Sequence, residues 1–153
     1  MSTGMTAAPV AAGLRIRSGV DLVAVSDVDN AITQFGQRYL DRVFTAHEIE
    51  SCAGLAQRVA EGLAARFAAK EAAIKVLRPR DTPLDWRSIE VRRDADGICT
   101  LQLSGTALLL AEQAGIVDIS VALSHEGDIA TAMVVALCAT PPEDLTSTTE
   151  REK

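Results

Sequence analysis

Cysteines, aromatic residues and long apolar runs are all scarce in this sequence of 153 residues. Its three cysteines, Cys52, Cys99 and Cys138, form no CxxC pair and leave one thiol over in any disulfide scheme, which favours a reducing compartment. No segment approaches the roughly 18 uninterrupted apolar residues that a membrane-spanning helix needs. We therefore expect a cytoplasmic protein without membrane contact, and the absence of Lys and Arg from residues 1–13 argues against a signal peptide.

Several catalytic motifs and a surplus of positive charge are also missing. The sequence contains no HExxH, P-loop or GxSxG motif, so zinc hydrolysis, Walker-type ATP use and serine hydrolysis lack support. Its 15 Lys and Arg stand against 21 Asp and Glu, giving a net charge of -6. Because nucleic-acid binding relies on clustered Lys and Arg, we expect no nucleic-acid partner.

Hydrophobic residues, in contrast, make up 48% of the chain. At this length they predict a single domain whose core needs neither disulfides nor a structural metal. Residues 1–13 are small and featureless, and residues 141–153 are rich in Pro, Thr and acidic side chains. We therefore expect a folded domain over residues 14–140 between a flexible N-terminal segment and a flexible C-terminal tail.

The spacing of apolar residues predicts the first half of the domain. A strand covers residues 20–25, and Ser26 with Asp29 is expected to cap a helix that follows it. That helix presents a single apolar stripe, formed by Val28, Ile32, Phe35, Tyr39 and Val43.

Two further helices follow in this half of the domain. Thr45 and Glu48 form a capping box for a short helix that stops near Gly54. A long third helix runs from residue 55 to about residue 77, where the dipeptide Arg78-Pro79 ends it because the residue before proline disfavours helical geometry.

The second half of the domain alternates between apolar and polar residues, as strands do. Residues 89–91 and 99–103 form a hairpin around a turn at 94–97. A helix at 105–115, a strand at 119–123 and an almost continuously apolar last strand at 129–139, expected to be central and buried, complete the chain. Hairpins with segregated helices indicate an α+β domain, an antiparallel sheet with one long buried helix.

The long helix has the most informative pattern. Between Leu63 and Leu77 nearly every position off its apolar stripe is alanine, so the helix is apolar all round and is expected to be enclosed. Buried charges are costly without a counter-charge, a metal or an anionic ligand, so the charged residues of this helix mark a candidate site. They are Arg66, Lys70, Glu71 and Lys75.

Asp21 is the second unusual carboxylate, because it interrupts an apolar strand. Together with Glu71 it would suit Mg²⁺, which takes one or two protein carboxylates and completes its shell with water and substrate phosphate. Two simpler alternatives stay open. Glu71 and Lys75 have the spacing of an ordinary helical ion pair, and Asp21 could face solvent from an edge strand.

The charge distribution is consistent with a phosphorylated substrate. Residues 66–93 contain eight Lys and Arg against four acids, which gives this segment a net charge of +4 in an acidic chain. Ser124 and His125 precede the last strand at a predicted turn, where a side chain can face a ligand, although a surface histidine is the simpler alternative. This pattern fits a polyanionic small molecule better than a nucleic acid.

Three motifs together resemble the holo-acyl-carrier-protein synthases, which are small 4'-phosphopantetheinyl transferases. They are Gly19-Val20-Asp21-Leu22-Val23, the run Arg66-Phe67-Ala68-Ala69-Lys70-Glu71-Ala72 followed by Lys75, and Ser124-His125 before an apolar strand. The second motif is highly specific, and the resemblance covers residues 18–137. It implies the 4'-phosphopantetheinyl transferase-like fold.

The resemblance also implies an activity and roles for these residues. Phosphopantetheine would move from coenzyme A (CoA) to a serine of an apo acyl carrier protein, with Mg²⁺ held by Asp21 and Glu71 and with release of adenosine 3',5'-bisphosphate. Glu71, directly or through water, would be the base, and Lys75 would act near the leaving phosphate. The resemblance further implies that CoA is bound by Arg66, Lys70, Lys75, Ser124 and His125.

Partners follow from the same resemblance. Relatives of this size are typically trimers with CoA sites at subunit boundaries, so the resemblance implies a homotrimer. In many of them the first helix begins with basic residues that bind an acidic carrier, whereas this chain reads Ser26-Asp27-Val28-Asp29 and has its bases later, at Arg38 and Arg42. Like charges across an interface slow encounter, so we expect a less acidic carrier, such as one from a polyketide pathway, in place of the fatty-acid carrier.

Two other functions remain compatible with the sequence. One is a CoA or nucleotide-bisphosphate binding module that transfers nothing, although such a module has less reason to keep Glu71 and Lys75 in an apolar helix. The other is a structural trimer in which these two residues form a plain ion pair.

Overall fold

The computed structural model describes residues 13–54 and 58–139. The predicted flexible ends lie outside this part of the chain, apart from Gly13. The elements are β1 (Leu14–Ala24), α1 (Val25–Phe35), α2 (Gln37–Val43), α3 (Ala46–Ala53), α4 (Val59–Leu77), the 3-10 turn η1 (Trp86–Ser88), β2 (Ile89–Arg93), β3 (Cys99–Leu103), α5 (Gly105–Gln113), β4 (Ile116–Glu126) and β5 (Ile129–Ala139). The expected α+β class is confirmed.

Three long strands form an antiparallel sheet in the order β1-β5-β4. β5 is its middle strand, as predicted, and alternate residues of β5 are buried. Those residues are small: Ala130, Ala132, Val134, Ala136 and Cys138. Small side chains on this face allow a helix to pack close to the sheet.

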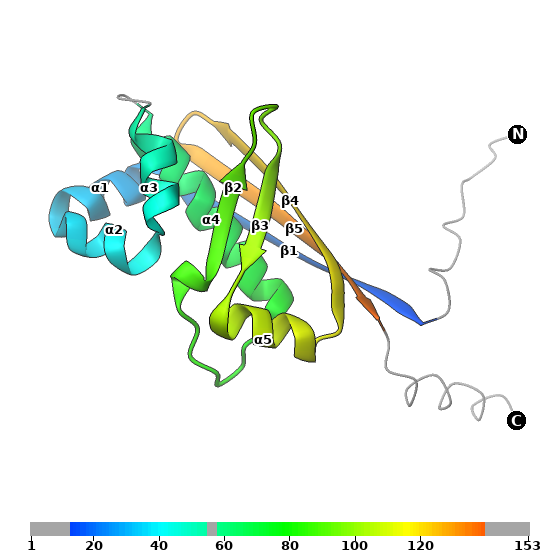
Figure 1. The fold of residues 1–153 in the computed structure, drawn as a ribbon. Coiled ribbons are helices and arrows are strands. Elements are labelled where there is room, and N and C mark those ends of the chain that lie inside the picture. Colours follow the sequence, from blue (N-terminus) through cyan, green and yellow to red (C-terminus); the bar gives the residue numbers. More distant parts are fainter. Residues whose placement is uncertain (1–12, 55–57, 140–153) are drawn as a thin grey trace, which may run out of the picture.

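That helix is α4, and it lies between two β layers (Figure 1). The three-stranded sheet covers one side of it, and the β2–β3 hairpin covers the other. Five of the seven alanines of α4 are buried and the other two are partly buried, which confirms that this helix is enclosed. Its end at Leu77 is also confirmed, with Arg78 in the left-handed conformation at φ 54° before Pro79.

A close approach of α4 to the sheet occurs at Gly19. A Cβ atom added to Gly19 would overlap the carbonyl oxygen of Ala72 and would lie 3.1 Å from Cβ of Lys75. Real Cβ atoms do not approach a backbone oxygen so closely, so only glycine fits between β1 and α4 here. This contact sets the height of α4 above the strand that carries Asp21.

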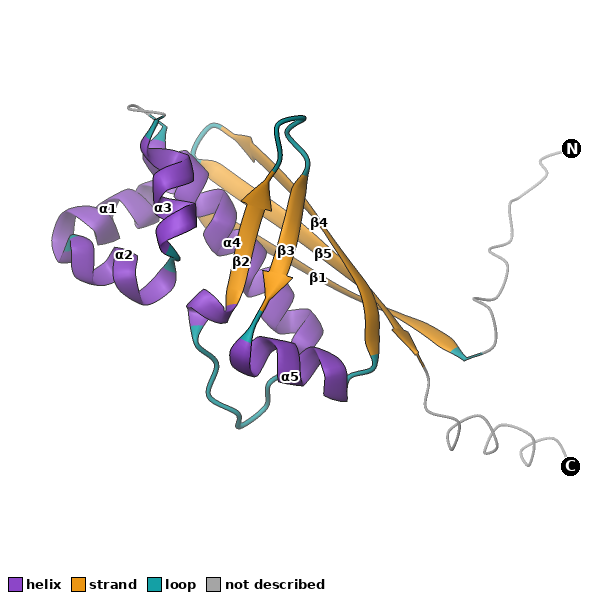
Figure 2. Ribbon diagram, in the orientation of Figure 1, coloured by secondary structure: helices purple, strands orange, loops and turns teal. Residues whose placement is uncertain are grey.

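Helices α1, α2 and α3 cluster at one end of the molecule, beside the first turns of α4 (Figure 2). The single first helix predicted from its apolar stripe is wrong. Gly36, at φ 54°, separates α1 from α2, and Phe35 is 54% exposed because the chain turns before it can reach the core. The capping box of Thr45 and Glu48 and the end of α3 at Gly54 are confirmed.

The cap of α1 comes from another part of the chain. The Ser26 backbone N–H donates to Oδ1 of Asp128 at 2.9 Å, and its hydroxyl donates to Oδ2 at 2.6 Å. The Val25 N–H donates to the Asp128 carbonyl. The predicted cap by Ser26 and Asp29 is therefore wrong. Asp128, in the β4–β5 turn, accepts hydrogen bonds from the free N–H groups at the start of α1 and so connects the two segments.

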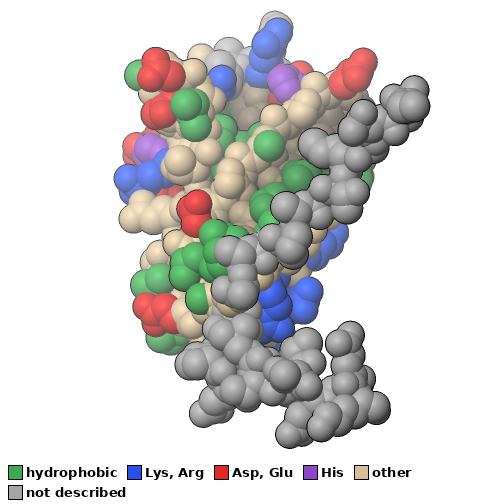
Figure 3. Space-filling view, turned by 90° about the vertical axis from the view of Figure 1, so that its right-hand side faces the viewer, with side chains coloured by type: hydrophobic (Ala, Val, Ile, Leu, Met, Phe, Trp, Pro, Cys, Tyr) green, Lys and Arg blue, Asp and Glu red, His purple; other side chains and the backbone are tan. Residues whose placement is uncertain are grey.

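The outer face of the sheet, opposite α4, is apolar and exposed. It includes Ile16, Val20, Leu22 and Met133, each at least half exposed, and Val20 lies beside Met133 in the β1–β5 register. On the face in view, Figure 3 shows several separate groups of hydrophobic side chains, with charged side chains between and around them. Among the residues described, no helix is long and apolar enough to cross a membrane.

The close contact at Gly19 gives a direct stability prediction. Gly19→Ala should lower the free energy of unfolding by about 2 kcal/mol or more, because the new methyl group meets backbone that cannot move aside cheaply. Urea denaturation followed by circular dichroism measures this change. Gly54→Ala is the matched control, since nothing lies within 4 Å of its added Cβ and its φ is −71°. Equal stability of the two variants would contradict this description of the β1–α4 contact.

Candidate active site

Asp21 and Glu71 line the same surface pocket, which has a volume of about 510 Å³. The pocket lies where β1, α1, α2 and α4 meet. Its remaining lining residues are Leu22, Val23, Ala24, Asp27, Val28, Tyr39 and Phe67. The two carboxylates that were singled out from the sequence, 50 positions apart, are thus brought together by the fold.

Alternation along β1 explains how Asp21 reaches this pocket. Val20 and Leu22 point to the exposed outer face of the sheet, so Asp21 between them points to the face that α4 covers. β1 is an edge strand, but the Asp21 side chain is only 21% exposed. The alternative of an aspartate directed to solvent from an edge strand is therefore wrong.

The Lys75 ammonium holds Asp21 in place. Its Nζ lies 2.7 Å from Oδ1 of Asp21 and 2.7 Å from the carbonyl oxygen of Val20. Lys75 thus connects α4 to β1 instead of serving only as the helical partner of Glu71. The Lys75 side chain is 50% exposed, so its charge also faces solvent at the edge of the site.

Glu71 is the carboxylate whose ionisation is most affected by this arrangement. Partial burial raises its pKa, and the nearby negative charge of Asp21 raises it further, whereas Lys75 acts in the opposite direction. A carboxylate with a raised pKa is a stronger base and gains more from a cation than an ordinary glutamate does.

The donor set of the pocket fits a hard divalent cation. Three carboxylates line the pocket, from Asp21, Asp27 and Glu71. One oxygen of Asp21 already forms an ion pair with the Lys75 ammonium. Across residues 13–54 and 58–139 there is no cluster of three His, Cys, Asp or Glu that would hold a metal by protein ligands alone. Mg²⁺ needs only one or two carboxylates together with water and phosphate, so a site completed by substrate fits these residues.

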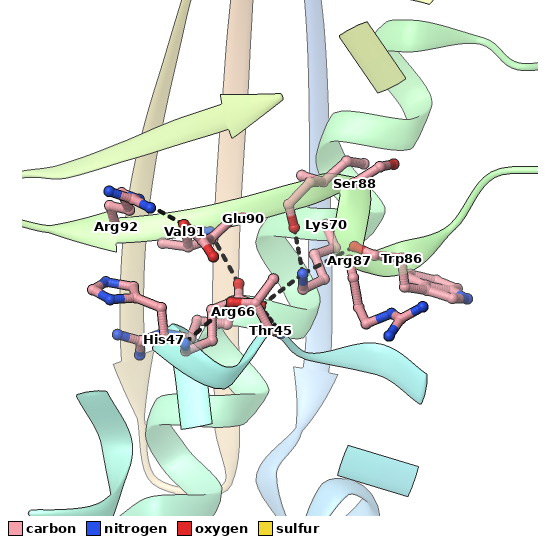
Figure 4. Close-up of polar contacts among 12 residues, drawn as sticks. Thr45, His47, Arg66, Lys70, Trp86, Arg87, Ser88, Glu90, Val91 and Arg92 are labelled. Atoms are coloured by element: carbon pink, nitrogen blue, oxygen red, sulfur yellow. Dashed lines mark hydrogen bonds and ion pairs between the residues drawn. The ribbon is translucent and has the colours of Figure 1, made fainter. Parts of the chain in front are cut away.

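Lys70 does not face the pocket. Its side chain is fully buried, and its Nζ lies 2.8 Å from Oε2 of Glu48 while donating to the carbonyl oxygens of Trp86, at 3.0 Å, and Ile89 (Figure 4). These three acceptors use all three of its N–H groups. The expectation that Lys70 binds CoA does not fit this position, because its charge is satisfied inside the protein.

Arg66 also points away from the pocket. Its Nη1 donates to the carbonyl oxygen of Gly62, one turn earlier, at 3.1 Å. Its Nε is buried without a protein partner, and its charge lowers the pKa of the Cys52 thiol against the larger opposite effect of burial. The structure therefore does not bring Arg66 together with Asp21 and Glu71.

His125 and Ser124 lie outside the pocket of their own chain. Nε2 of His125 is 3.6 Å from Oε2 of Glu61, in the first turn of α4. Glu61 and Glu71 are ten positions apart, about 15 Å along the helix axis. Ser124 is exposed on the neighbouring position of β4. Within one chain, the His125 end of the sheet is thus separate from the two carboxylates.

The basic segment of residues 66–93 does not form one patch. Several of its charges have local partners: Arg87 pairs with Asp85, Arg92 pairs with Glu90, and Lys70 pairs with Glu48. The residues of this pocket that the sequence analysis did not assign to the site include Asp27, Tyr39 and Phe67. A single sequence gives no signal for Tyr39 and Phe67, because they also have the spacing of ordinary core residues.

Comparisons with known proteins identify the family. The model of the 4'-phosphopantetheinyl transferase superfamily matches residues 17–134. A relative from Chloroflexus aurantiacus, named holo-(acyl-carrier-protein) synthase, is 43% identical over 133 residues, covering 77% of this chain and 95% of that protein. The chain therefore belongs to the 4'-phosphopantetheinyl transferase superfamily and is similar to its holo-acyl-carrier-protein synthases.

Solved structures agree with this assignment and confirm the predicted fold. An ACPS–CoA complex from Chronobacterium ammoniagenes matches with a TM-score of 0.72 at 31% identity, over 83% of this chain and 99% of that chain. A holo-(acyl-carrier-protein) synthase from Bacillus anthracis, in complex with CoA (3',5'-ADP), matches with a TM-score of 0.62 at 26% identity, over 80% and 96% of the two chains.

The raised pKa of Glu71 predicts a pH-dependent stability. A carboxyl group whose pKa is higher in the folded than in the unfolded state binds its proton more tightly when folded, so its cost to stability grows as pH rises through the folded-state pKa. Glu71→Gln removes this cost. Without divalent cations, the melting temperature of the Glu71→Gln variant should exceed that of the wild type by more at pH 8 than at pH 5.

Thermal denaturation at both pH values in the presence of a chelator measures the difference. Glu112→Gln, on the exposed side of α5, is the matched control and should show the same difference from wild type at both pH values. A Glu71→Gln gain that is equal at pH 5 and pH 8 would contradict the raised pKa.

Proposed function

We propose that this protein transfers 4'-phosphopantetheine from CoA to a serine of an apo acyl carrier protein, releasing adenosine 3',5'-bisphosphate. The observation that carries the proposal is the meeting of Asp21 and Glu71 in one pocket, with Lys75 paired to Asp21 beside it. The CoA named in the complexes of its structural relatives supports the same substrate. The free thiols of Cys52, Cys99 and Cys138 are consistent with a reducing cytoplasmic setting.

The charge of the pocket supports a requirement for a cation with the substrate. Its three carboxylates repel a bare pyrophosphate, and Lys75 supplies only one positive charge at the edge. Asp21 and Glu71 would hold Mg²⁺ here. When bound, the ion supplies charge neutralisation for the pyrophosphate, which is the main requirement of phosphoryl transfer.

The reaction forms one bond and breaks one bond. The carrier serine oxygen attacks the phosphorus atom that bears the pantetheine arm, and the bond from this phosphorus to the oxygen of the leaving bisphosphate breaks. Glu71, directly or through one water, accepts the serine proton, a task suited to its raised pKa. Lys75, half exposed beside Asp21, stabilises the negative charge of the departing phosphate.

The transfer is tested by intact mass spectrometry of a panel of apo carrier proteins after incubation with the protein, CoA and Mg²⁺. We expect the mass of one phosphopantetheine to be added. Asp21→Asn and Glu71→Gln should each lower the rate by about 100-fold or more, because each removes charge needed at the reacting group.

Two controls make the same change from carboxylate to amide at exposed positions: Asp96→Asn in the β2–β3 turn and Glu112→Gln on α5. Both should keep wild-type rates. Equal rates for the pocket variants and the controls would contradict the proposed site. Binding of CoA without transfer to any carrier would support the non-catalytic binding module instead.

We also propose that the protein forms a homotrimer with CoA sites at its subunit boundaries. The exposed apolar face at Val20, Leu22 and Met133 supports an interface between copies of the chain. The separation of His125 from Glu71 within one chain supports a site to which a second subunit contributes His125 and its neighbour Ser124.

Sedimentation equilibrium tests the assembly at micromolar concentrations. We expect a trimer for the wild type and a monomer for Met133→Arg, because the new charge would be buried without a partner. Leu109→Arg, an exposed leucine of α5 away from the sheet, should remain trimeric. A wild-type protein that stays monomeric throughout this concentration range would overturn the proposal.

The carrier is proposed to be less acidic than fatty-acid carriers. Asp27, in the first turn of α1, and Asp29, two positions later, are both exposed next to the pocket that Asp27 helps to line. Arg38 and Arg42 are exposed on α2, farther along the chain. An acidic carrier helix that approaches the pocket from α1 therefore meets negative charge first.

Steady-state kinetics with two carriers tests this preference. We expect a higher kcat/KM for a weakly acidic polyketide carrier than for a strongly acidic fatty-acid carrier. Asp29→Lys should raise kcat/KM for the acidic carrier, with the increase largest at low salt. An equal or higher wild-type kcat/KM with the fatty-acid carrier would count against the proposal.

A further inference from the structure

The ion pair of Glu48 and Lys70 is the most deeply buried charged group among the residues described. Both side chains are 0% exposed, with 2.8 Å between Oε2 of Glu48 and Nζ of Lys70. Lys70 lies next to Glu71 in α4, yet it contacts no residue of the candidate pocket in the bonds described above. Such a pair is expensive to bury, and apolar residues of similar size often give equal or greater stability.

The partners of Lys70 come from three different elements. Its ammonium contacts Glu48 of α3, donates to the carbonyl oxygen of Trp86 in η1, and donates to that of Ile89 at the start of β2. Figure 4 shows this ammonium between α4, the Trp86 segment and the Thr45 segment. A single group thus connects α4 to three elements on the side away from the sheet.

Glu48 fixes the other end of this network. Its Oε1 accepts from the backbone N–H of Val91 in β2 at 2.9 Å, and its Oε2 accepts from the backbone N–H of Thr45 at 3.0 Å. Both carboxylate oxygens therefore bond to backbone that cannot rotate like a side chain. The Lys70 ammonium is consequently held against a rigid frame of strand and helix start.

The opposite side of α4 is fixed by the sheet. Ala72 contacts Gly19 there, and two helical residues that are two positions apart are separated by about 200° around the axis. Lys70 and Ala72 therefore hold α4 on nearly opposite sides. Glu71 lies between them in the sequence and also in angular position around the helix axis. Fixing both sides prevents the helix from turning about its axis.

We infer that Glu48 and Lys70 are positioning residues, which set the rotation of α4 so that Glu71 and Lys75 face Asp21. The inference rests on the proposed transfer reaction. A side-chain tip lies about 5–6 Å from the helix axis, so a rotation of α4 by about 10° would move this tip by about 1 Å. Misplacement on this scale can cost about 100-fold in rate, so the helix must be held tightly.

The test uses the full-length protein and the double variant Glu48→Gln, Lys70→Met. The Glu48→Gln change removes the negative charge but keeps one oxygen for the backbone N–H groups, and the Lys70→Met change keeps most of the length of the side chain. Removing both charges avoids leaving one of them buried alone. We expect kcat to fall by about tenfold or more, while the dissociation constant for CoA, measured by calorimetry, changes less than about twofold.

The control is Asp85→Asn, Arg87→Gln, which removes an exposed ion pair from the segment that contains Trp86. This control should keep the wild-type kcat. Urea denaturation shows whether each variant is folded, and Glu48→Gln alone serves as a second variant if the double variant does not fold. Glu48→Gln should then show the same loss of kcat at unchanged CoA affinity.

Three outcomes are informative. A folded variant with wild-type kcat would overturn the inference and leave the pair a purely structural role. A weakened CoA affinity at unchanged kcat would also overturn it, in favour of a binding role for Lys70. If the wild type itself shows no transfer to any carrier, the proposed function fails instead, so the two failures are distinguishable.

Discussion

The close packing of α4 against β1 is the constraint on which the rest of the structure depends. Only a glycine at position 19 leaves room for the Ala72 carbonyl, and this contact brings the helix that carries Glu71 and Lys75 onto the strand that carries Asp21. The alanines of α4 serve the same purpose on both sides of the helix, because small side chains let the sheet and the hairpin approach its backbone. The composition of one helix therefore determines the geometry of the site.

Electrostatics follows from this geometry. Partial burial raises the pKa of Glu71, the nearby charge of Asp21 raises it further, and Lys75 offsets only part of the negative charge. The resulting negative charge favours a cation and disfavours a phosphate that arrives without one. Lys70 has a different environment one residue away, since its charge is neutralised by Glu48 inside the protein. In the proposed mechanism, Glu71 therefore takes part in the reaction, while the adjacent Lys70 supports the geometry of the site.

Much of the fold could be predicted from the sequence, because periodicity and caps are local signals. The end of α4, the α3 capping box and the last strand depend on such signals and are confirmed. The cap from Asp128 depends on a contact 102 positions along the chain, which periodicity cannot show. The break at Gly36 is local, at a glycine with φ 54°, but the apolar spacing continues across it and hides it. In the site, Asp21 and Glu71 stand out as charges in apolar elements. Lys70 carries the same signal for a different reason, so only its partners reveal its role.

The most direct test of the account is anomalous diffraction from crystals containing Mn²⁺ and CoA, with Mn²⁺ in place of Mg²⁺. We predict one anomalous peak between the carboxylates of Asp21 and Glu71, at a ligand distance of about 2.1 Å, with the CoA pyrophosphate completing its coordination. Bound CoA with the metal elsewhere, or with neither carboxylate in contact with it, would contradict the central claim that the β1–α4 contact builds a cation-dependent site for phosphopantetheine transfer.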